Sequence, residues 1–177
     1  MPADIDFVVH LAAIADVRRS LEEPELYWTT NVEYSKKIFD LCHKNDIPVV
    51  YASSSCVHAW WKSPYGTSKK AMEAIAHPGQ VGLRFTTVFG DGARDTMLIS
   101  RIRNGTVKFA TEHVRDLIYV EDVVSAIMIF VENGTQDKNA TYEVGTGQGY
   151  KVSDIVKHAG CLLYTSPSPR DERLSRM

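Results

Sequence analysis

The first 65 residues contain no glycine, and the earliest one in the chain is Gly66. Glycine allows positive φ and a close approach of the backbone to a phosphate, so a glycine-rich phosphate-binding turn is excluded from this region. Cysteine is scarce as well: Cys42, Cys56 and Cys161 have neither metal-site spacing nor the even number of a disulfide framework. We therefore expect no metal site and no set of disulfides.

A basic surplus and a long apolar run are also missing. The formal net charge is −2, and Lys and Arg form no patch, which argues against nucleic acid as a partner. No run approaches the ~20 apolar residues of a membrane span, and the opening MPADIDFVVH lacks the layout of a signal peptide. We expect a cytoplasmic protein with no membrane partner. Its 177 residues, 44% of them hydrophobic, suit one globular domain or a fragment of a larger protein.

The last segment does not read as part of a fold. Residues 161–171, CLLYTSPSPRD, match the translation of a transposon-type sequencing adapter, and the final SRM matches the adapter segment that would follow. A natural tail rich in Ser and Pro is the weaker alternative. We expect residues 161–177 to be a non-native tail outside the fold.

The first half of the chain alternates between strand and helix patterns. Apolar runs without strict alternation, typical of strands buried on both faces of a parallel sheet, occupy residues 5–13, 47–52 and 80–85. Between the first two runs a helix is expected from Pro24 to Asn45, and another starts near Pro64 and stops before Pro78. This order predicts right-handed crossovers and an α/β fold.

The pattern changes after Gly90. The expected elements are a helix, two strands and a second helix, over residues 94–105, 106–110, 115–120 and 121–134. Residues 140–145 and 151–160 complete the part that precedes the tail. No repeat or low-complexity linker is present, so a second lobe would be built from this region.

Tyr65 and Lys69 are four positions apart in SPYGTSKK. At helical spacing they share one face about 5 to 6 Å apart, where an ammonium favours the phenolate. A free tyrosine has a pKa near 10, and lowering it by about 3 units requires about 4 kcal/mol. One charge about 4 Å away at an effective dielectric of 20 supplies a similar amount. The spacing alone is weak, because a solvated Tyr/Lys pair on a surface helix has the same pattern.

A serine run precedes this pair. In YASSSCVH the serines end a buried strand, where open α/β sheets bind their ligands. Serines that cap backbone groups at the end of a strand are the plain alternative. The two signals on consecutive elements favour a shared site.

Seven segments resemble, in order, the extended short-chain dehydrogenase/reductase family: HLAA, NV in the following helix, YASSSCV, SPYGTSK, GLRFTTVFG, RDLIYVEDVVSAI and YEVGTGQGY. The likeness is greatest to nucleotide-sugar epimerases such as UDP-glucose and UDP-glucuronate 4-epimerases, and it covers nearly all of residues 5–160. It implies a partial Rossmann-type doubly wound parallel sheet with a small α/β substrate lobe. It also implies NAD as cofactor, a nucleotide sugar as substrate and a homodimer for the complete protein.

The resemblance assigns catalytic roles to three residues. Tyr65 resembles the catalytic base, and Lys69 the residue that lowers the pKa of the tyrosine and holds the nicotinamide ribose. Ser54 resembles the residue that hydrogen-bonds the reacting sugar hydroxyl. The implied reaction is epimerisation by transient oxidation at C4: tyrosinate takes the hydroxyl proton while hydride passes to NAD, the keto sugar turns, and hydride returns to the other face.

Binding roles follow in the same way. The implied cofactor contacts, besides Tyr65 and Lys69, are Leu11, Ala12, Ala13 and Thr30. The implied substrate contacts are Ser54, Thr87, Arg115 and Arg18. A guanidinium at Arg115 suits the phosphates of the nucleotide. Arg18 lies in VRRS, which resembles the VRxS of uronate epimerases; a solvated arginine before a helix is an equal alternative.

The loop between Ser54 and Tyr65 departs from the family pattern. Eleven positions separate the two residues, about half the spacing in relatives, and eleven residues still span up to about 35 Å. Trp60 and Trp61 lie in this loop, where we expect aromatic cover over the core, with stacking on substrate as the alternative. A dehydratase of this family would have Asp-Glu after the serine, so the SC that follows Ser54 argues against dehydration.

The family carries its glycine-rich turn upstream of HLAA, so we expect the chain to start part-way through the cofactor domain. Residues 1–90 would be the C-terminal half of the Rossmann domain, and 91–160 the substrate-binding lobe with elements that return to the sheet. GTGQG at 145–149 is a poor substitute for the missing turn, because Tyr150 occupies the last glycine position of GxGxxG. The chain as written is expected to be inactive and to bind cofactor weakly.

Two other functions stay open on these residues. An NADP-dependent nucleotide-sugar reductase differs at the residue after the second strand of the family fold. A non-catalytic dinucleotide-sensing protein has the same fold, but the intact Ser54, Tyr65 and Lys69 argue against it.

Overall fold

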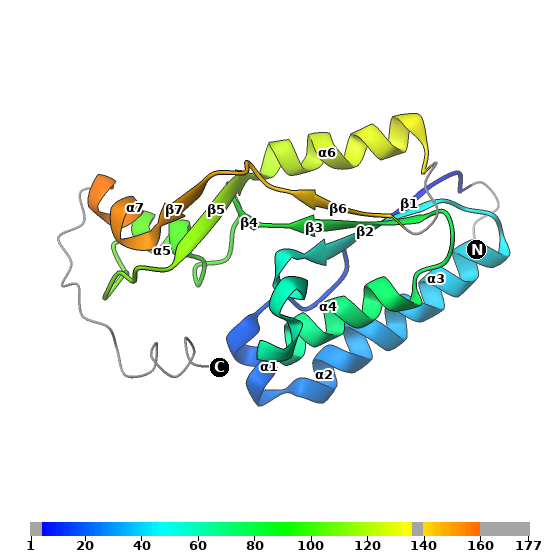
Figure 1. Ribbon diagram of the computed structural model, residues 1–177, viewed down its shortest axis with the longest axis horizontal. Coiled ribbons are helices and arrows are strands. Elements are labelled where there is room, and N and C mark those ends of the chain that lie inside the picture. Colours follow the sequence, from blue (N-terminus) through cyan, green and yellow to red (C-terminus); the bar gives the residue numbers. More distant parts are fainter. Residues whose placement is uncertain (1–4, 136–139, 160–177) are drawn as a thin grey trace. The chain divides into compact units, whose positions relative to one another are not determined.

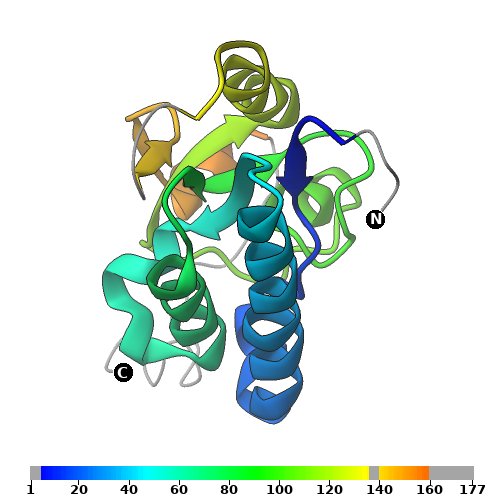
Figure 2. The same ribbon diagram turned by 90° about the vertical axis from the view of Figure 1, so that its right-hand side faces the viewer.

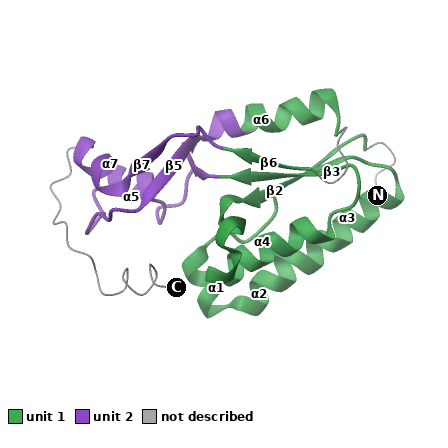
Figure 3. Cartoon of the chain, in the orientation of Figure 1, with its two compact units in different colours: residues 1–85, 124–144 green, residues 86–123, 145–177 purple. Residues whose placement is uncertain are grey.

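The computed structural model describes residues 5–135 and 140–159. The expected tail at 161–177, with Cys161, lies outside the described residues. Two compact units, shown in Figure 3, comprise the described parts of 1–85 with 124–144, and of 86–123 with 145–177. The assignment of one region to the cofactor and the other to the substrate stays a prediction.

The first unit contains a parallel sheet with the strand order β1-β2-β3-β6. The four strands are β1 Val8–His10, β2 Val49–Ser54, β3 Gln80–Phe85 and β6 Thr141–Val144. In the register of the sheet, Tyr51 pairs with His10 on one side and Gly82 on the other. The carboxyl ends of these strands therefore lie at one edge of the sheet, as the expected α/β fold requires.

Helices cover both faces of this sheet, which confirms the α/β class. In Figures 1 and 2, α3 and α4 lie along one face and the later part of α6 along the other. The helical segments are α1 Val17–Glu22, α2 Pro24–Trp28, the π-helical turn η1 Thr29–Glu33, α3 Tyr34–Lys44, the 3₁₀ segment η2 Ser55–Lys62, α4 Pro64–Ile75 and α6 Val120–Asn133.

The start of α4 follows from its sequence. Pro64 occupies the first helical position, where its missing N–H costs nothing, and the Ser63 hydroxyl accepts a hydrogen bond from the Gly66 N–H at 3.1 Å. On the inner side of α3 and α4, a buried apolar cluster joins both helices to β2: Phe39, Cys42, Val49, Tyr51 and Met72. This cluster fixes the helix pair on the sheet.

The second unit is smaller. It contains β4 Thr87–Phe89, α5 Leu98–Arg103, β5 Val114–Tyr119, β7 Gly149–Lys151 and α7 Val152–His158. Its sheet has the order β4-β5-β7, in which β5 is parallel to β4 and antiparallel to β7. A small core of Ala110, Val152 and Val156 packs against the apolar side chains of α5.

Several expected elements differ in the structure. The strand expected over 106–110 is wrong: these residues form no strand, because both edges of β5 are occupied by β4 and β7 while Val107 and Ala110 pack on the α5–α7 cluster. The first strand is only three residues long. The expected helix from Pro24 to Asn45 is interrupted by η1, and α1 and β4 were not expected at all.

Candidate active site

The helix α4 buries both Tyr65 and Lys69, with 9% and 2% of their surface exposed, and their spacing of one helical turn puts them on one face of the helix. The Tyr65 ring meets Tyr27 of α2 edge to face, with centroids 6.3 Å apart. The neighbouring Lys70 side chain is 48% exposed. Lys69 is therefore not one of the solvated lysines of a surface helix, and the surface-pair reading of this motif does not describe it.

The ammonium of Lys69 reaches the carboxyl end of β2. Its Nζ donates to the Ala52 carbonyl at 2.7 Å, a neutral partner. Burial lowers the pKa of Lys69 to about 8. The pKa of His10 is also lowered, first by burial and then by the nearby charge of Lys69. Lys69 thus lies close to the last residue of β1 as well as to β2, with a charge that an adjacent anion would stabilise.

Ser54 is the last residue of β2 and is 7% exposed. Its hydroxyl accepts from the Cys56 N–H at 3.2 Å, which caps the start of η2. The backbone of η2 then packs against the first turn of α4 so closely that a Cβ at Gly66 would lie 3.0 Å from Trp60 Cα and 3.3 Å from the Cys56 carbonyl oxygen. The short loop after Ser54 therefore lies directly against the residue that follows Tyr65.

The loop after β1 carries the implied cofactor contacts. Leu11 and Ala12 are exposed and Ala13 is partly exposed, at the carboxyl end of β1. Buried Asn31 holds this loop: its amide accepts from the Ile14 N–H at 2.9 Å and donates to the Ile14 carbonyl at 3.0 Å. The same amide group donates to Ser68 Oγ of α4 at 3.0 Å.

Thr30 lies next to this asparagine, in η1, and is partly exposed. Asn31 therefore brings the loop after β1, the turn η1 and helix α4 together. Thr30 is therefore connected through Asn31 to Ser68, the residue before Lys69. The role of Thr30 at the cofactor ribose stays a prediction.

A partly buried ion pair, joined by Ser53, ties α4 to two strands. Arg84 of β3 donates twice to Glu73, from Nε to Oε1 at 2.7 Å and from Nη2 to Oε2 at 2.8 Å, and the Ser53 hydroxyl donates to Oε1 at 2.7 Å. Burial raises the pKa of Glu73, but the hydrogen bonds from Arg84 and Ser53 and the charge of Arg84 outweigh burial and leave the pKa below its ordinary value. Glu73 is one helical turn beyond Lys69.

The two tryptophans of η2 do not cover the core. Trp60 is 42% exposed and Trp61 is 64% exposed, and their rings meet edge to face with centroids 6.0 Å apart. The backbone of Trp60 is held by the Thr67 hydroxyl, which donates to its carbonyl at 3.1 Å. The expected aromatic cover over the core is therefore wrong, because the packing of η2 on α4 uses the backbone and leaves both rings at the surface.

Arg18 lies in the first turn of α1 and is exposed; Asp16 caps this helix by accepting from the Arg18 and Arg19 N–H groups. Thr87 and Arg115 belong to the second unit. Thr87 starts β4 opposite Leu117, and Arg115 lies on β5, where its Nη1 donates to the Val114 carbonyl at 2.8 Å. Their part in a site with Tyr65 stays a proposal.

The GTGQG loop is filled by a carboxylate of the protein itself. Asp116 accepts from the Thr146 N–H at 3.0 Å, from the Thr146 hydroxyl at 2.6 Å and from the Gly147 N–H at 2.9 Å. A Cβ at Gly145 would lie 2.5 Å from an oxygen of Asp116, so glycine is needed there for close approach. These amides are already paired with an anion, which argues against this loop as a phosphate site.

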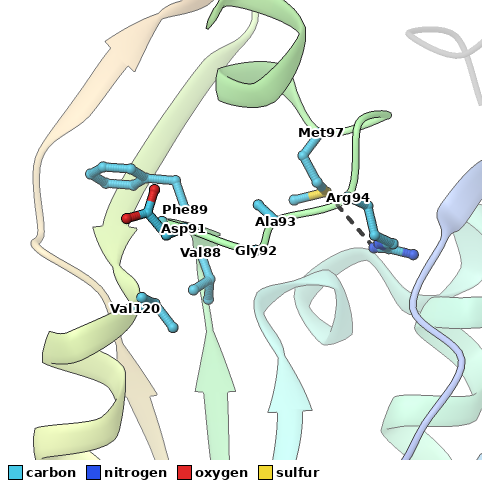
Figure 4. Close-up of a pocket in the computed structure, with 9 residues that line it drawn as sticks. Val88, Phe89, Asp91, Gly92, Ala93, Arg94, Met97 and Val120 are labelled. Carbon is cyan, nitrogen blue, oxygen red and sulfur yellow. Dashed lines mark hydrogen bonds between the residues drawn. The ribbon is translucent and has the colours of Figure 1, made fainter.

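An open pocket lies within the second unit, in the loop that follows β4. Figure 4 shows its lining, where Arg94 Nη2 contacts the sulfur of Met97 at 3.7 Å. The lining residues are Val88, Phe89, Gly90, Asp91, Gly92, Ala93, Arg94, Met97 and Val120. Thr87, which was expected at the sugar, directly precedes this lining.

The described ranges 5–135 and 140–159 contain neither a metal-binding cluster nor a membrane-spanning helix. No group of three or more His, Cys, Asp or Glu side chains there could hold a metal ion. No helix within the same residues has both the length and the apolar character needed to cross a bilayer.

Sequence reasoning missed three contributors to this site: Asn31, Glu73 and Arg84. Glu73 could have been found, because residues 65, 69 and 73 follow one another at helical spacing. Asn31 and Arg84 act through partners distant in the sequence, which no local pattern reveals.

Comparison with known proteins gives the same fold and family. MoeE5, solved in complex with UDP-glucose and NAD, superposes with a TM-score of 0.81 at 30% identity, over 92% of this chain and 66% of that chain. UDP-glucuronate 4-epimerase 3 of Arabidopsis thaliana is 31% identical in an alignment of 202 positions, gaps included, which covers 92% of this chain and 44% of the relative. Protein CapI of Staphylococcus aureus is 33% identical over 156 residues, 72% of this chain and 47% of the relative.

The chain thus spans about half the length of the curated relatives it matches. The sequence profile of the NAD dependent epimerase/dehydratase family matches residues 1–145, most of the chain. The matched residues run from β1 to β6 and include Ser54, Tyr65 and Lys69. The chain therefore belongs to the NAD dependent epimerase/dehydratase family.

Proposed function

We propose that the complete protein epimerises a nucleotide sugar by transient oxidation at C4. The observation that carries the proposal is the buried ammonium of Lys69, one helical turn after Tyr65 and hydrogen-bonded to the end of β2 where Ser54 lies. A charge costs free energy in this position unless an anion accompanies it, and tyrosinate 65 would be that anion.

The residues fit a bound NAD on one side of the site. Leu11 to Ala13 form an exposed loop at the carboxyl end of β1, where open α/β sheets bind dinucleotides, and Lys69 lies next to the residue that precedes this loop. Lys69 would hold the nicotinamide ribose, and Thr30 would lie near a ribose of the cofactor. When bound, NAD takes up a hydride from the sugar carbon and later returns it.

The catalytic residues of the chain then act on one hydroxyl. Tyr65 as phenolate accepts the proton of the sugar C4 hydroxyl and gives it back after the keto sugar has turned. Ser54 donates to the same oxygen and stabilises the charge that develops there. Lys69 keeps Tyr65 ionised near neutral pH.

The proposed substrate contacts are Thr87, Arg115 and Arg18, with Arg115 at the phosphates. We propose a homodimer in the cytoplasm.

The test uses the complete protein, NAD and a panel of UDP-sugars, with the product epimer measured by chromatography. Tyr65→Phe should lose most turnover while cofactor still binds. The control is Tyr34→Phe, because Tyr34 lies on the exposed side of α3, 52% exposed, and should keep its activity. Unchanged turnover in Tyr65→Phe contradicts the proposal, and net consumption of NADPH would favour a reductase.

A further inference from the structure

Glu73 and Arg84 form a partly buried ion pair, with Glu73 one helical turn beyond Lys69 on α4. Glu73 has 6% of its side chain exposed and Arg84 has 19%. Two parallel N–H donors of one guanidinium meet two oxygens of one carboxylate, which fixes distance and orientation together. A single-point contact would fix a distance but not the orientation of the two groups.

The pair lies where three elements meet. Glu73 belongs to α4, Arg84 to β3, and the third partner, Ser53, is the residue of β2 immediately before Ser54. One turn earlier on the same face of α4, Lys69 donates to the carbonyl of Ala52. Two consecutive turns of α4 are therefore bonded to two consecutive residues at the end of β2.

The outer side of the pair is continued by further polar groups. Arg84 Nη1 donates to Glu143 of β6 at 3.0 Å, and His58 Nε2 of η2 lies 2.9 Å from the same oxygen of Glu143. Lys70 Nζ lies 3.4 Å from Glu73 Oε2. The network therefore links α4, β2, β3 and β6 with η2, which makes up most of the segment between Ser54 and Tyr65.

We propose that Glu73 and Arg84 are positioning residues, which lock α4 against the carboxyl end of β2 so that Tyr65 and Lys69 keep a fixed position relative to this strand end. This inference rests on the proposed function and goes beyond it. A buried ion pair is weak support for stability, since apolar residues of similar size often stabilise as well or better. Its use here is the fixed geometry of the helix, not the strength of the fold.

The experiment measures how much Tyr65 is phenolate at pH 8 in the 177-residue chain, by NMR of ¹³C-labelled tyrosine with Tyr65→Phe for assignment. The key variant is Glu73→Gln/Arg84→Met, which removes the two-point contact and takes away both charges of the pair together, while Glu143 and Lys70, which also contact the pair, are half exposed to water. We expect it to lose at least half of the phenolate signal seen in the wild type. If the double variant had the same phenolate fraction as the wild type, charge balance alone would explain the pair and the positioning role would be overturned.

A matched control separates positioning from loss of stability. Val49→Ala empties part of the core at the opposite end of β2, where Val49 is fully buried, and it should lower the melting temperature without changing the phenolate fraction. An equal loss of phenolate in Val49→Ala would contradict the positioning role. If the double variant does not fold, Arg84→Lys keeps the charge but not the two-point contact, and it should lower the fraction; an unchanged fraction overturns the proposal.

The outcomes also distinguish the two proposals. If Tyr65 shows no phenolate at pH 8 in either the wild-type chain or Lys69→Met, the proposed chemistry and the positioning role are overturned together. A phenolate that depends on Lys69 but not on Glu73 and Arg84 overturns the positioning role alone.

Discussion

Replacing Lys69 by Met should change how the stability of this chain depends on pH. The pKa of Lys69 is lowered by burial to about 8, from 10.5 in the unfolded chain. Between these values the unfolded state binds more protons than the folded state, so the free energy of unfolding of the wild type rises as pH increases. Each pKa unit corresponds to about 1.4 kcal/mol, and the full window of 2.5 units therefore to about 3 kcal/mol.

The neutral variant lacks this dependence. At pH 7 it escapes the cost of about 3 kcal/mol for the buried ammonium but loses the hydrogen bond to Ala52, about 1 kcal/mol. Lys69→Met should therefore be about 2 kcal/mol more stable than the wild type at pH 7, and this advantage should vanish by about pH 10. A functional residue that destabilises the fold is expected at an active site.

The assay is urea unfolding of wild type and Lys69→Met at several pH values from 7 to 10, so that contributions from other groups cancel in the difference. Lys70→Met is the matched control, because its side chain is 48% exposed and should show a difference that does not vary with pH. A pH-independent difference between wild type and Lys69→Met would refute the reasoning, since it would mean that Lys69 is solvated and that its pKa is the same in the folded and unfolded chain.

Three other changes test the contacts around the site. Gly66→Ala should cost about 1–3 kcal/mol in urea unfolding, because its Cβ would meet Trp60 backbone atoms at 3.0 Å; no loss would contradict the close packing of η2 on α4. Asn31→Ala should cost about 3 kcal/mol and speed amide exchange at Ile14, and unchanged exchange would refute its role in holding that loop. Asp116→Asn should speed exchange at the Thr146 and Gly147 amides. In the wild type, burial raises the pKa of Asp116, but hydrogen bonds from Thr146 and Gly147 outweigh burial and leave the pKa below its ordinary value. The two amides should therefore stay protected from exchange until the pH falls below the ordinary pKa of an aspartate. Unchanged protection of these amides in Asp116→Asn would contradict the role of this carboxylate.

The local features of the first unit were predictable from the sequence. Pro64 and Ser63 define the start of α4, and buried runs such as VVYASS have the composition of parallel strands. The spacing of Tyr65 and Lys69 then determines that they share a helical face. These features depend on neighbours within a few residues, which is why sequence reasoning reached them.

Features that depend on distant partners were not predictable. Residues 106–110 have the pattern of a strand, but β5 has no free edge for them. Asn31 meets Ile14 and Ser68, 17 and 37 positions away, and the partners of Arg84 come from α4 and β6. The burial of Lys69 is likewise a product of the packing of α4 on the sheet, so its lowered pKa could not be read from YGTSK alone.

The proposed chemistry depends on the electrostatic coupling of Tyr65 to Lys69. The most direct measurement compares the fraction of Tyr65 present as phenolate at pH 8 between the wild-type chain and Lys69→Met, by NMR of ¹³C-labelled tyrosine. At the spacing of about 6 Å typical of residues one helical turn apart, and with an effective dielectric of 20, an ammonium lowers the pKa of a phenol by about two units. We expect a substantial phenolate signal in the wild type and none in the variant. The same signal in both proteins would contradict this coupling.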